Sequence, residues 1–207
     1  MIRFVRPAAL ASLALLLLVV GAALRPLVIP ETPHAAPVLD DVEIGFVQDM
    51  AAHHQQALLM TGRLASDVDP VVTALARQMS DAQRVETGTL LGWLRLVEAP
   101  PTNPRPMAWQ PAVGHEHAGA AEDAMPGMAT TAELDALAAA HGREAEVLFL
   151  QLMQRHHLGG VAMARAADQV LTGGPVEQAA RDMMQEQGRE AGLMTLMLAQ
   201  RGARPLG

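Results

Sequence analysis

The sequence predicts an all-α protein: a four-helix bundle made from two copies of one helical hairpin, joined by a long crossover. Apolar residues recur at helical spacing in both halves, and no segment shows the alternation that is typical of a strand. The pattern Phe-x-x-x-Met-x-x-His-His occurs at 46–54 and again at 149–157, an offset of 103 residues. Repetition in register over so long a context indicates a duplicated structural unit.

Composition narrows the classes of function. The 207 residues, of which 50% are hydrophobic, are enough for one sizeable core. A net charge of -7 and an aromatic content of 2% argue against a nucleic-acid partner. The chain has no Cys, which excludes disulfides, thiolate metal sites and thiol nucleophiles. A soft metal ligand must therefore come from the 13 Met residues.

Residues 1–25 have the pattern of an export signal. Arg3 and Arg6 precede an apolar run at 7–24, and a Pro-rich tether follows at 26–39. The run is long enough for a signal peptide and just long enough for a single transmembrane anchor with a cytoplasmic N-terminus. In both interpretations the rest of the chain is exported, periplasmic or at the cell surface, and the membrane is a partner only if the segment stays uncleaved.

The exported part, residues 40–201, divides into three segments. Hairpins are expected at 40–99 and 130–201, and the segment 100–129 between them is a crossover without apolar periodicity. Each expected helix begins with a capping residue or a proline. The four helices are expected at about 40–65, 70–98, 130–171 and 175–201.

The histidine pairs and two carboxylates fall on the apolar faces of these helices. His53 lies near the centre of the apolar stripe of its helix, and His54 lies on the flank. The partner helix has Glu86 within its stripe, and Glu190 repeats this in the second hairpin. A buried carboxylate costs several kcal/mol unless it is paired, hydrogen-bonded or bound to a cation. Each hairpin thus brings histidine, methionine and a carboxylate to the seam between helices.

A structural interpretation needs no metal. In it, His53 and His156 donate to Glu86 and Glu190 as buried pairs that fix the register, and methionines fill the core. Charging of the two imidazoles between about pH 5 and 7 could then alter the packing. The protein would be a structural or interaction bundle.

A metal-binding interpretation competes with it. Imidazole and thioether ligands together select copper, because thioethers suit Cu(I) and imidazoles suit both Cu(I) and Cu(II). This interpretation also gives a role to His54 and His157, which the structural one leaves without a task. It predicts a copper buffer or carrier with no catalytic turnover.

The crossover contains a second candidate metal site. His115 and His117 form a His-x-His motif, and Met125 and Met128 follow it. Such a segment can wrap around a metal ion, although a solvated linker has the same composition.

The motifs Met50-x-x-His53-His54-x-x-Ala57-x-x-Met60 and Met153-x-x-His156-His157 resemble the bacterial domain of unknown function 305 family (DUF305). The resemblance spans about residues 40–201 and implies a ferritin-like four-helix bundle, secreted or membrane-tethered, with copper binding in some members. Gly160 departs from the pattern, since Ala57 holds the equivalent place, and either close helix approach or a local loosening of the helix is expected there. The metal ligands implied by the resemblance are Met50, His53, His54, Met60, Met153, His156, His157 and Met163, with Met79, Glu86, Met183 and Glu190 from the partner helices.

An enzymatic site is not expected. A ferritin-type di-iron oxidoreductase would need Glu-x-x-His motifs on its bundle helices, and the four expected helices have none. No nucleophile elbow or zinc-protease motif occurs either. The partner expected from the sequence is therefore a metal ion; a homo-oligomer is compatible with it, and no protein partner is indicated.

Overall fold

The structure is a computed structural model that describes residues 13–21, 24, 38–110 and 125–206. The chain divides into two compact units, Met1–Pro37 and Val38–Gly207. In the first unit, residues 13–21 are helical. Most of the predicted export signal and tether lies outside the described residues. Among those that are described, no helix has the length and apolar character needed to cross a bilayer.

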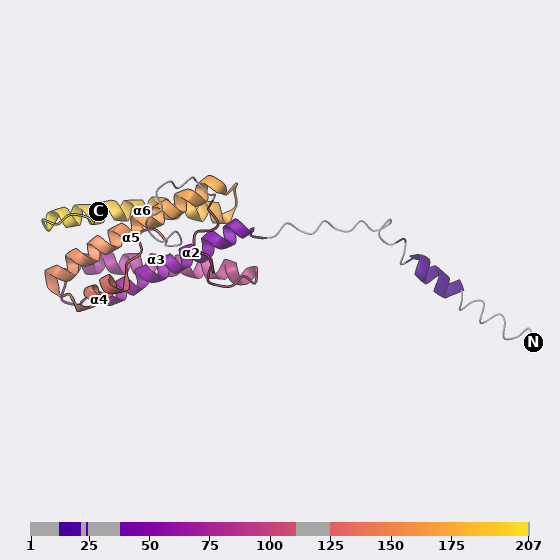
Figure 1. Cartoon of the computed structure of the whole chain (residues 1–207), viewed down its shortest axis with the longest axis horizontal. Helices are drawn as coiled ribbons and strands as arrows, with labels where there is room; N and C mark the ends of the chain where they lie inside the picture. The colour runs from indigo at the N-terminus through magenta and orange to yellow at the C-terminus, as the bar shows by residue number, and fades with distance from the viewer. Residues whose placement is uncertain (1–12, 22–23, 25–37, 111–124, 207) are drawn as a thin grey trace, which may run out of the picture. The chain divides into compact units, whose positions relative to one another are not determined.

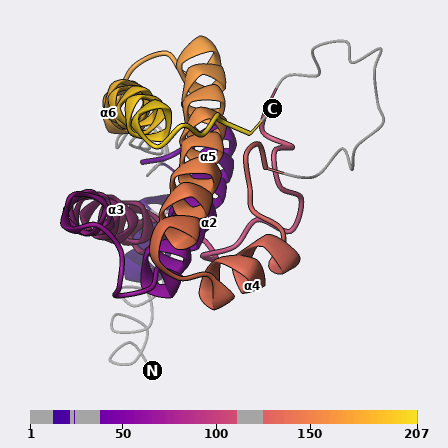
Figure 2. The ribbon, with the colours of Figure 1, turned by 90° about the vertical axis from the view of Figure 1, so that its left-hand side faces the viewer.

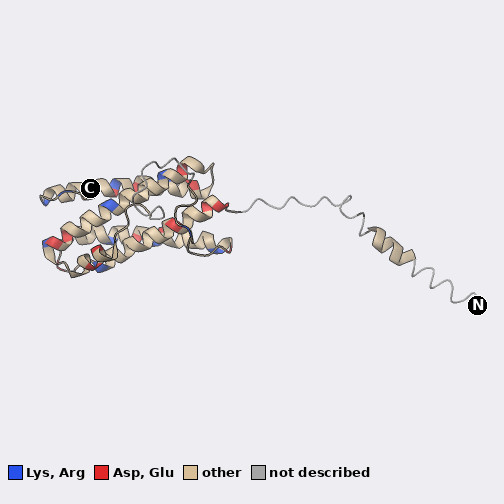
Figure 3. Cartoon of the chain, in the orientation of Figure 1, with Lys and Arg blue, Asp and Glu red and all other residues tan. Residues whose placement is uncertain are grey.

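The second unit is all-α over its described residues, as predicted (Figure 1). Charged residues of both signs are interspersed along its helices (Figure 3). Its helices are α2 (Asp41–Arg63), α3 (Pro70–Leu96), α4 (Thr131–Ala139), α5 (Gly142–Val170) and α6 (Pro175–Gln200).

Local sequence signals explain where the helices begin. Asp40 caps α2 in a capping box, in which the Glu43 side chain accepts from the Asp40 backbone N–H. Asp69 accepts from the second residue of α3, whose first residue is Pro70. Thr130 forms the predicted capping box of α4. The expected helix starts in both hairpins are therefore confirmed.

The prediction of one long helix over 130–171 is wrong, because the chain breaks between α4 and α5. Ala140 and His141 have extended backbone angles, and Gly142 follows with φ of +51°, in the left-handed region. The Gly142 N–H donates to Asp67 Oδ1 at 3.2 Å. The loop of the first hairpin therefore stabilises the chain where α4 ends and α5 begins. The turn lets α4 pack against α2 and α5.

The two hairpins join through their first long helices. Helix α3 packs on α2, α6 packs on α5, and α2 packs on α5. Seen along the bundle, α3 and α6 lie on one side of the α2 and α5 layer, and α4 lies on the other (Figure 2). This arrangement places α2 and α5, which bear the histidine pairs, at the centre of the unit.

Candidate metal centre

Two histidine–carboxylate pairs with buried imidazoles occupy equivalent places in the two hairpins. His54 Nε2 lies 2.7 Å from Glu86 Oε2, and His157 Nε2 lies 2.8 Å from Glu190 Oε2. Both imidazoles are fully buried, whereas the Glu86 side chain is 24% exposed and that of Glu190 is 9% exposed. The same contact between matching residues supports the duplication inferred from the sequence.

The predicted pairing of His53 with Glu86 and of His156 with Glu190 is wrong. Instead the rings of His53 and His156 stack, with centroids 3.8 Å apart and an interplanar angle of 27°. These two residues face each other because α2 and α5 pack together at this level. The second histidine of each pair, on the flank of the stripe, is the one that reaches the carboxylate of the neighbouring helix.

Backbone carbonyl groups fix the tautomers of the stacked pair. His53 Nε2 lies 3.1 Å from the Pro126 oxygen, and His156 Nε2 lies 3.1 Å from the His53 oxygen. A carbonyl oxygen can only accept, so Nε2 donates in both rings. Burial lowers the pKa of His53 to about 3, and it also takes the pKa of His156 well below its ordinary value. Neighbouring imidazoles lower both values further. Each ring is therefore neutral, with a lone pair on Nδ1.

The Nδ1 atoms of all four paired histidines are buried and have no hydrogen-bond partner within the described structure. Buried polar atoms are normally paired, so four such atoms in one layer call for an explanation. Metal-binding histidines typically donate their other ring N–H to a carboxylate or a backbone carbonyl. That is the arrangement observed at Nε2 in each of the four rings.

The predicted methionine ligands flank the histidine layer in two clusters. All six are buried. Each cluster combines residues from both hairpins, so neither belongs to one repeat alone. Met50, Met163 and Met183 belong to one apolar cluster, and Met60, Met79 and Met153 belong to the other.

Two glutamines add further unpaired polar atoms to this layer. Both amide atoms of Gln83 and of Gln187 are buried without a partner in the described structure. A Cβ on Gly160 would lie 2.1 Å from Gln187 Oε1. The group that approaches this glycine closely is therefore the Gln187 side chain of α6. Sequence patterns did not mark Pro126, because the role of its carbonyl depends on the path of the crossover.

The crossover site is only partly described. His115 and His117 lie outside the described residues. Met125 is half-buried against the cluster that contains Met50, and Met128 is half-buried. Its backbone oxygen accepts from Arg155 Nη2 at 3.4 Å.

Within the ranges that the structure describes, no group of three or more His, Asp or Glu side chains is placed to hold a metal ion. The predicted imidazole and thioether ligands are buried in this core.

Comparison with known proteins places the chain in a family. The DUF305 profile, described as a domain of unknown function, matches residues 43–198. No curated protein matches the chain. One similar crystal structure is that of a predicted secreted DUF305 protein from Streptomyces coelicolor, which is 37% identical in sequence and has a TM-score of 0.71. The match covers 80% of this chain and 96% of the Streptomyces coelicolor chain. The crystal structure of a DUF305 fragment from Deinococcus radiodurans is 32% identical in sequence and has a TM-score of 0.63. This match covers 78% of the present chain and 97% of the fragment. The chain thus belongs to the DUF305 family.

Proposed function

We propose that the protein is an exported copper-binding protein, a buffer or carrier that holds the ion in the bundle core without turnover. The observation behind the proposal is the set of four buried imidazoles whose Nδ1 atoms have no partner in the described structure. Their Nε2 atoms are already oriented by carboxylates and carbonyls, as in known metal sites.

The choice of copper follows from the donor chemistry. A ligand must be deprotonated to bind a metal, and His53 and His156 are neutral at physiological pH because burial lowers their pKa. Thioethers favour Cu(I), and the buried methionines on both sides of the histidine layer supply them. Magnesium and calcium would need a shell made almost wholly of oxygen ligands, whereas both carboxylates of this layer already bind histidine side chains.

Export is the second part of the proposal. Positively charged residues before an apolar run are typical of an export signal. The Streptomyces coelicolor relative is described as a predicted secreted protein. A chain without Cys that works outside the cytoplasm would depend on His and Met to hold copper.

Titration of the purified full-length protein with Cu(II), and with Cu(I) under anaerobic reducing conditions, tests the proposal. Saturable binding is expected in the wild type. It should be lost when His53, His54, His156 and His157 are changed to Ala. The matched control is His141→Ala, which removes an exposed imidazole from the N-terminus of α5.

A second set of variants keeps the experiment informative if the histidine variant does not fold. Changing Met50, Met60, Met153 and Met163 to Leu conserves volume and should leave the fold intact. Cu(I) binding should weaken strongly in this variant, and Cu(II) binding should weaken less. Absence of binding in the folded wild type would contradict the proposal.

The structural bundle remains the second candidate, favoured by the two buried His–Glu pairs. In that case the pairs fix the register of the helices, and copper has no effect on stability. Thermal unfolding with and without copper therefore separates the two candidates.

A further inference from the structure

The side of the unit between α3 and α6 contains a small pocket with a distinctive lining. Its volume is about 180 Å³, and both helices contribute to its walls. Figure 2 shows these two helices on the same side of the central layer. The pocket is lined by Val85, Glu86, Thr89 and Trp93 of α3 and by Ala179, Asp182 and Met183 of α6.

Glu86 connects this pocket with the buried histidine layer. Its side chain is 24% exposed, yet its Oε2 atom lies 2.7 Å from Nε2 of the fully buried His54. Met183 lines the same pocket, is only 3% exposed and belongs to the cluster that contains Met50 and Met163. A carboxylate and a thioether thus lie between solvent and the core.

The equivalent carboxylate of the second hairpin is closed off. Glu190 is 9% exposed, and its Oε1 atom is buried without a partner in the described structure. A second pocket between α3 and α6, of about 380 Å³, has neither Glu190 nor any other charged residue in its lining. The two histidine–carboxylate pairs, equivalent in sequence, therefore differ in their access to solvent.

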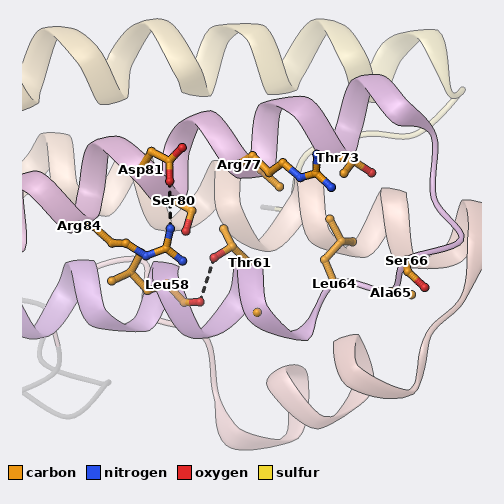
Figure 4. Close-up of a pocket in the computed structure, with 12 residues that line it drawn as sticks. Leu58, Thr61, Leu64, Ala65, Ser66, Thr73, Arg77, Ser80, Asp81 and Arg84 are labelled. Atoms are coloured by element: carbon orange, nitrogen blue, oxygen red, sulfur yellow. Dashed lines mark hydrogen bonds and ion pairs between the residues drawn. The ribbon is translucent and has the colours of Figure 1, made fainter.

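A larger pocket, of about 480 Å³, lies between α2 and α3 and has a different electrostatic character (Figure 4). Arg77 and Arg84 line it, and among the described residues only Arg84 has a carboxylate partner, Asp81. Two guanidinium groups disfavour the approach of a cation. The pocket at Glu86 has two carboxylates and no basic residue in its lining.

We infer that copper passes into and out of the core through the α3/α6 pocket at Glu86, which we call the access pocket. This inference rests on the proposed function. Asp182 and Glu86 attract the cation, and Met183 offers the first soft ligand on the way inward. The pair of His54 and Glu86 then forms the half of the centre that exchanges copper with solvent. The pair of His157 and Glu190 forms the half that is closed to solvent.

Filling the pocket tests the inference. Thr89→Trp places an indole in the access pocket from an exposed position on α3. The matched control is Gln78→Trp, which fills the other α3/α6 pocket from the same helix. Loading is measured by stopped flow with full-length protein and with Cu(I) supplied as its bicinchoninate complex.

Thr89→Trp should slow loading about tenfold or more, because the ion must wait for a local opening, while stoichiometry at equilibrium stays the same. Gln78→Trp should load at the wild-type rate. Loading of Thr89→Trp at the wild-type rate, or equal slowing by Gln78→Trp, overturns the inference and leaves the proposed function intact. A wild type that binds no copper at equilibrium overturns both.

Glu86→Gln provides a test that does not depend on a bulky side chain. The amide oxygen can still accept from His54, but the charge that attracts the cation is gone. Loading should slow about tenfold at low ionic strength and less at high ionic strength. Its control is Glu186→Gln on α6, which removes a carboxylate paired with Arg189 at the surface and outside the pocket lining. Equal rates for the two variants contradict the role of Glu86.

Discussion

Gly159 shows how strongly a single residue can control the layer around the histidines. A Cβ at this position would lie 2.0 Å from the backbone oxygen of Pro126, the atom that accepts from His53. Backbone atoms cannot move aside cheaply, so Gly159→Ala should lower the free energy of unfolding by about 3 kcal/mol. Urea denaturation measures this loss.

The control for that substitution is Gly192→Ala in α6, where a Cβ would meet nothing within 4 Å. This variant should be neutral or more stable by up to about 1 kcal/mol, because alanine is the better helix former. Equal effects at the two glycines would contradict the close contact at Pro126.

The stacked histidines make the stability of the metal-free protein depend on pH. The pKa of His53 falls to about 3 in the folded protein from an ordinary value of 6.5, and that of His156 also lies well below 6.5. Below pH 6.5 the unfolded chain binds protons that the folded protein does not. Stability should therefore be full above about pH 6.5 and fall as the pH drops below that value, by about 1 kcal/mol per pH unit for each ring.

Denaturant unfolding of the metal-free protein at pH 7, 6 and 5 measures this dependence. His53→Gln removes one titrating ring and should reduce the slope, whereas His141→Ala on the surface should not. A slope that is the same in wild type and His53→Gln would show that the stacked pair does not titrate as described.

The partners of these histidines were harder to predict than their burial. Apolar periodicity placed His53 at the centre of a stripe and His54 on its flank, and both are buried. Periodicity gives the direction of a side chain around its own helix, but the partner depends on how the neighbouring helices are rotated. For this reason periodicity alone pairs Glu86 with His53, whereas in the structure Glu86 binds His54.

At the scale of elements, Asp49 in α2 fixes the first part of the crossover. Its Oδ2 atom accepts from Asn103 at 3.2 Å, from the Met107 backbone at 2.6 Å and from Trp109 Nε1 at 2.8 Å. Burial is the largest influence on this carboxyl and raises its pKa, while the three donors oppose the rise. Because the donors come from three positions between residues 103 and 109, one side chain fixes this first part of the crossover.

Asp49→Ala should release this segment. The loss of hydrogen bonds to a buried charged group predicts a destabilisation of about 3 kcal/mol, and Trp109 should become more exposed. Fluorescence in a Trp93→Phe background would report Trp109 alone, with a shift of its emission to longer wavelength. Asp81→Ala, which removes an exposed carboxylate from α3, should change neither quantity. An unchanged spectrum in Asp49→Ala would show that other contacts hold the crossover.

Helix starts were predictable, and one helix break was not. Caps such as Asp40 and Thr130 act within a few residues of the helix they begin, so the sequence contains the whole signal. The break before α5 has no proline to mark it. It depends on the Gly142 N–H reaching Asp67, 75 residues earlier in the chain. Contacts of that separation are not visible in local patterns.

At the scale of the whole molecule, duplication explains the composition of the core but did not predict its arrangement. The offset of 103 residues identified equivalent positions, yet it gave no information on which helices would meet. In the structure α2 and α5 meet, so each methionine cluster takes residues from both hairpins. Met50 of the first repeat shares its cluster with Met163 and Met183 of the second.

This arrangement leads to a prediction for the stability of the whole unit. If copper is held by residues of both hairpins, the ion binds the folded protein and opposes separation of the hairpins. Free copper at about 100 times its dissociation constant should then add about 2.7 kcal/mol to the free energy of unfolding. For a unit of this size the melting temperature should rise by about 5 to 10 °C, as measured by calorimetry.

Variants test whether the rise comes from this centre. His141→Ala should keep it, because that imidazole is exposed and outside the core. The variant with Leu at positions 50, 60, 153 and 163 should lose most of the rise with Cu(I), since each methionine cluster is then depleted of thioethers. The opposite result in the wild type is a melting temperature that copper leaves unchanged and that acid lowers. That result would show that the buried histidines serve the packing of the helices and do not bind copper. The same experiment thus decides between a bundle that binds copper and one whose buried histidines only fix its packing.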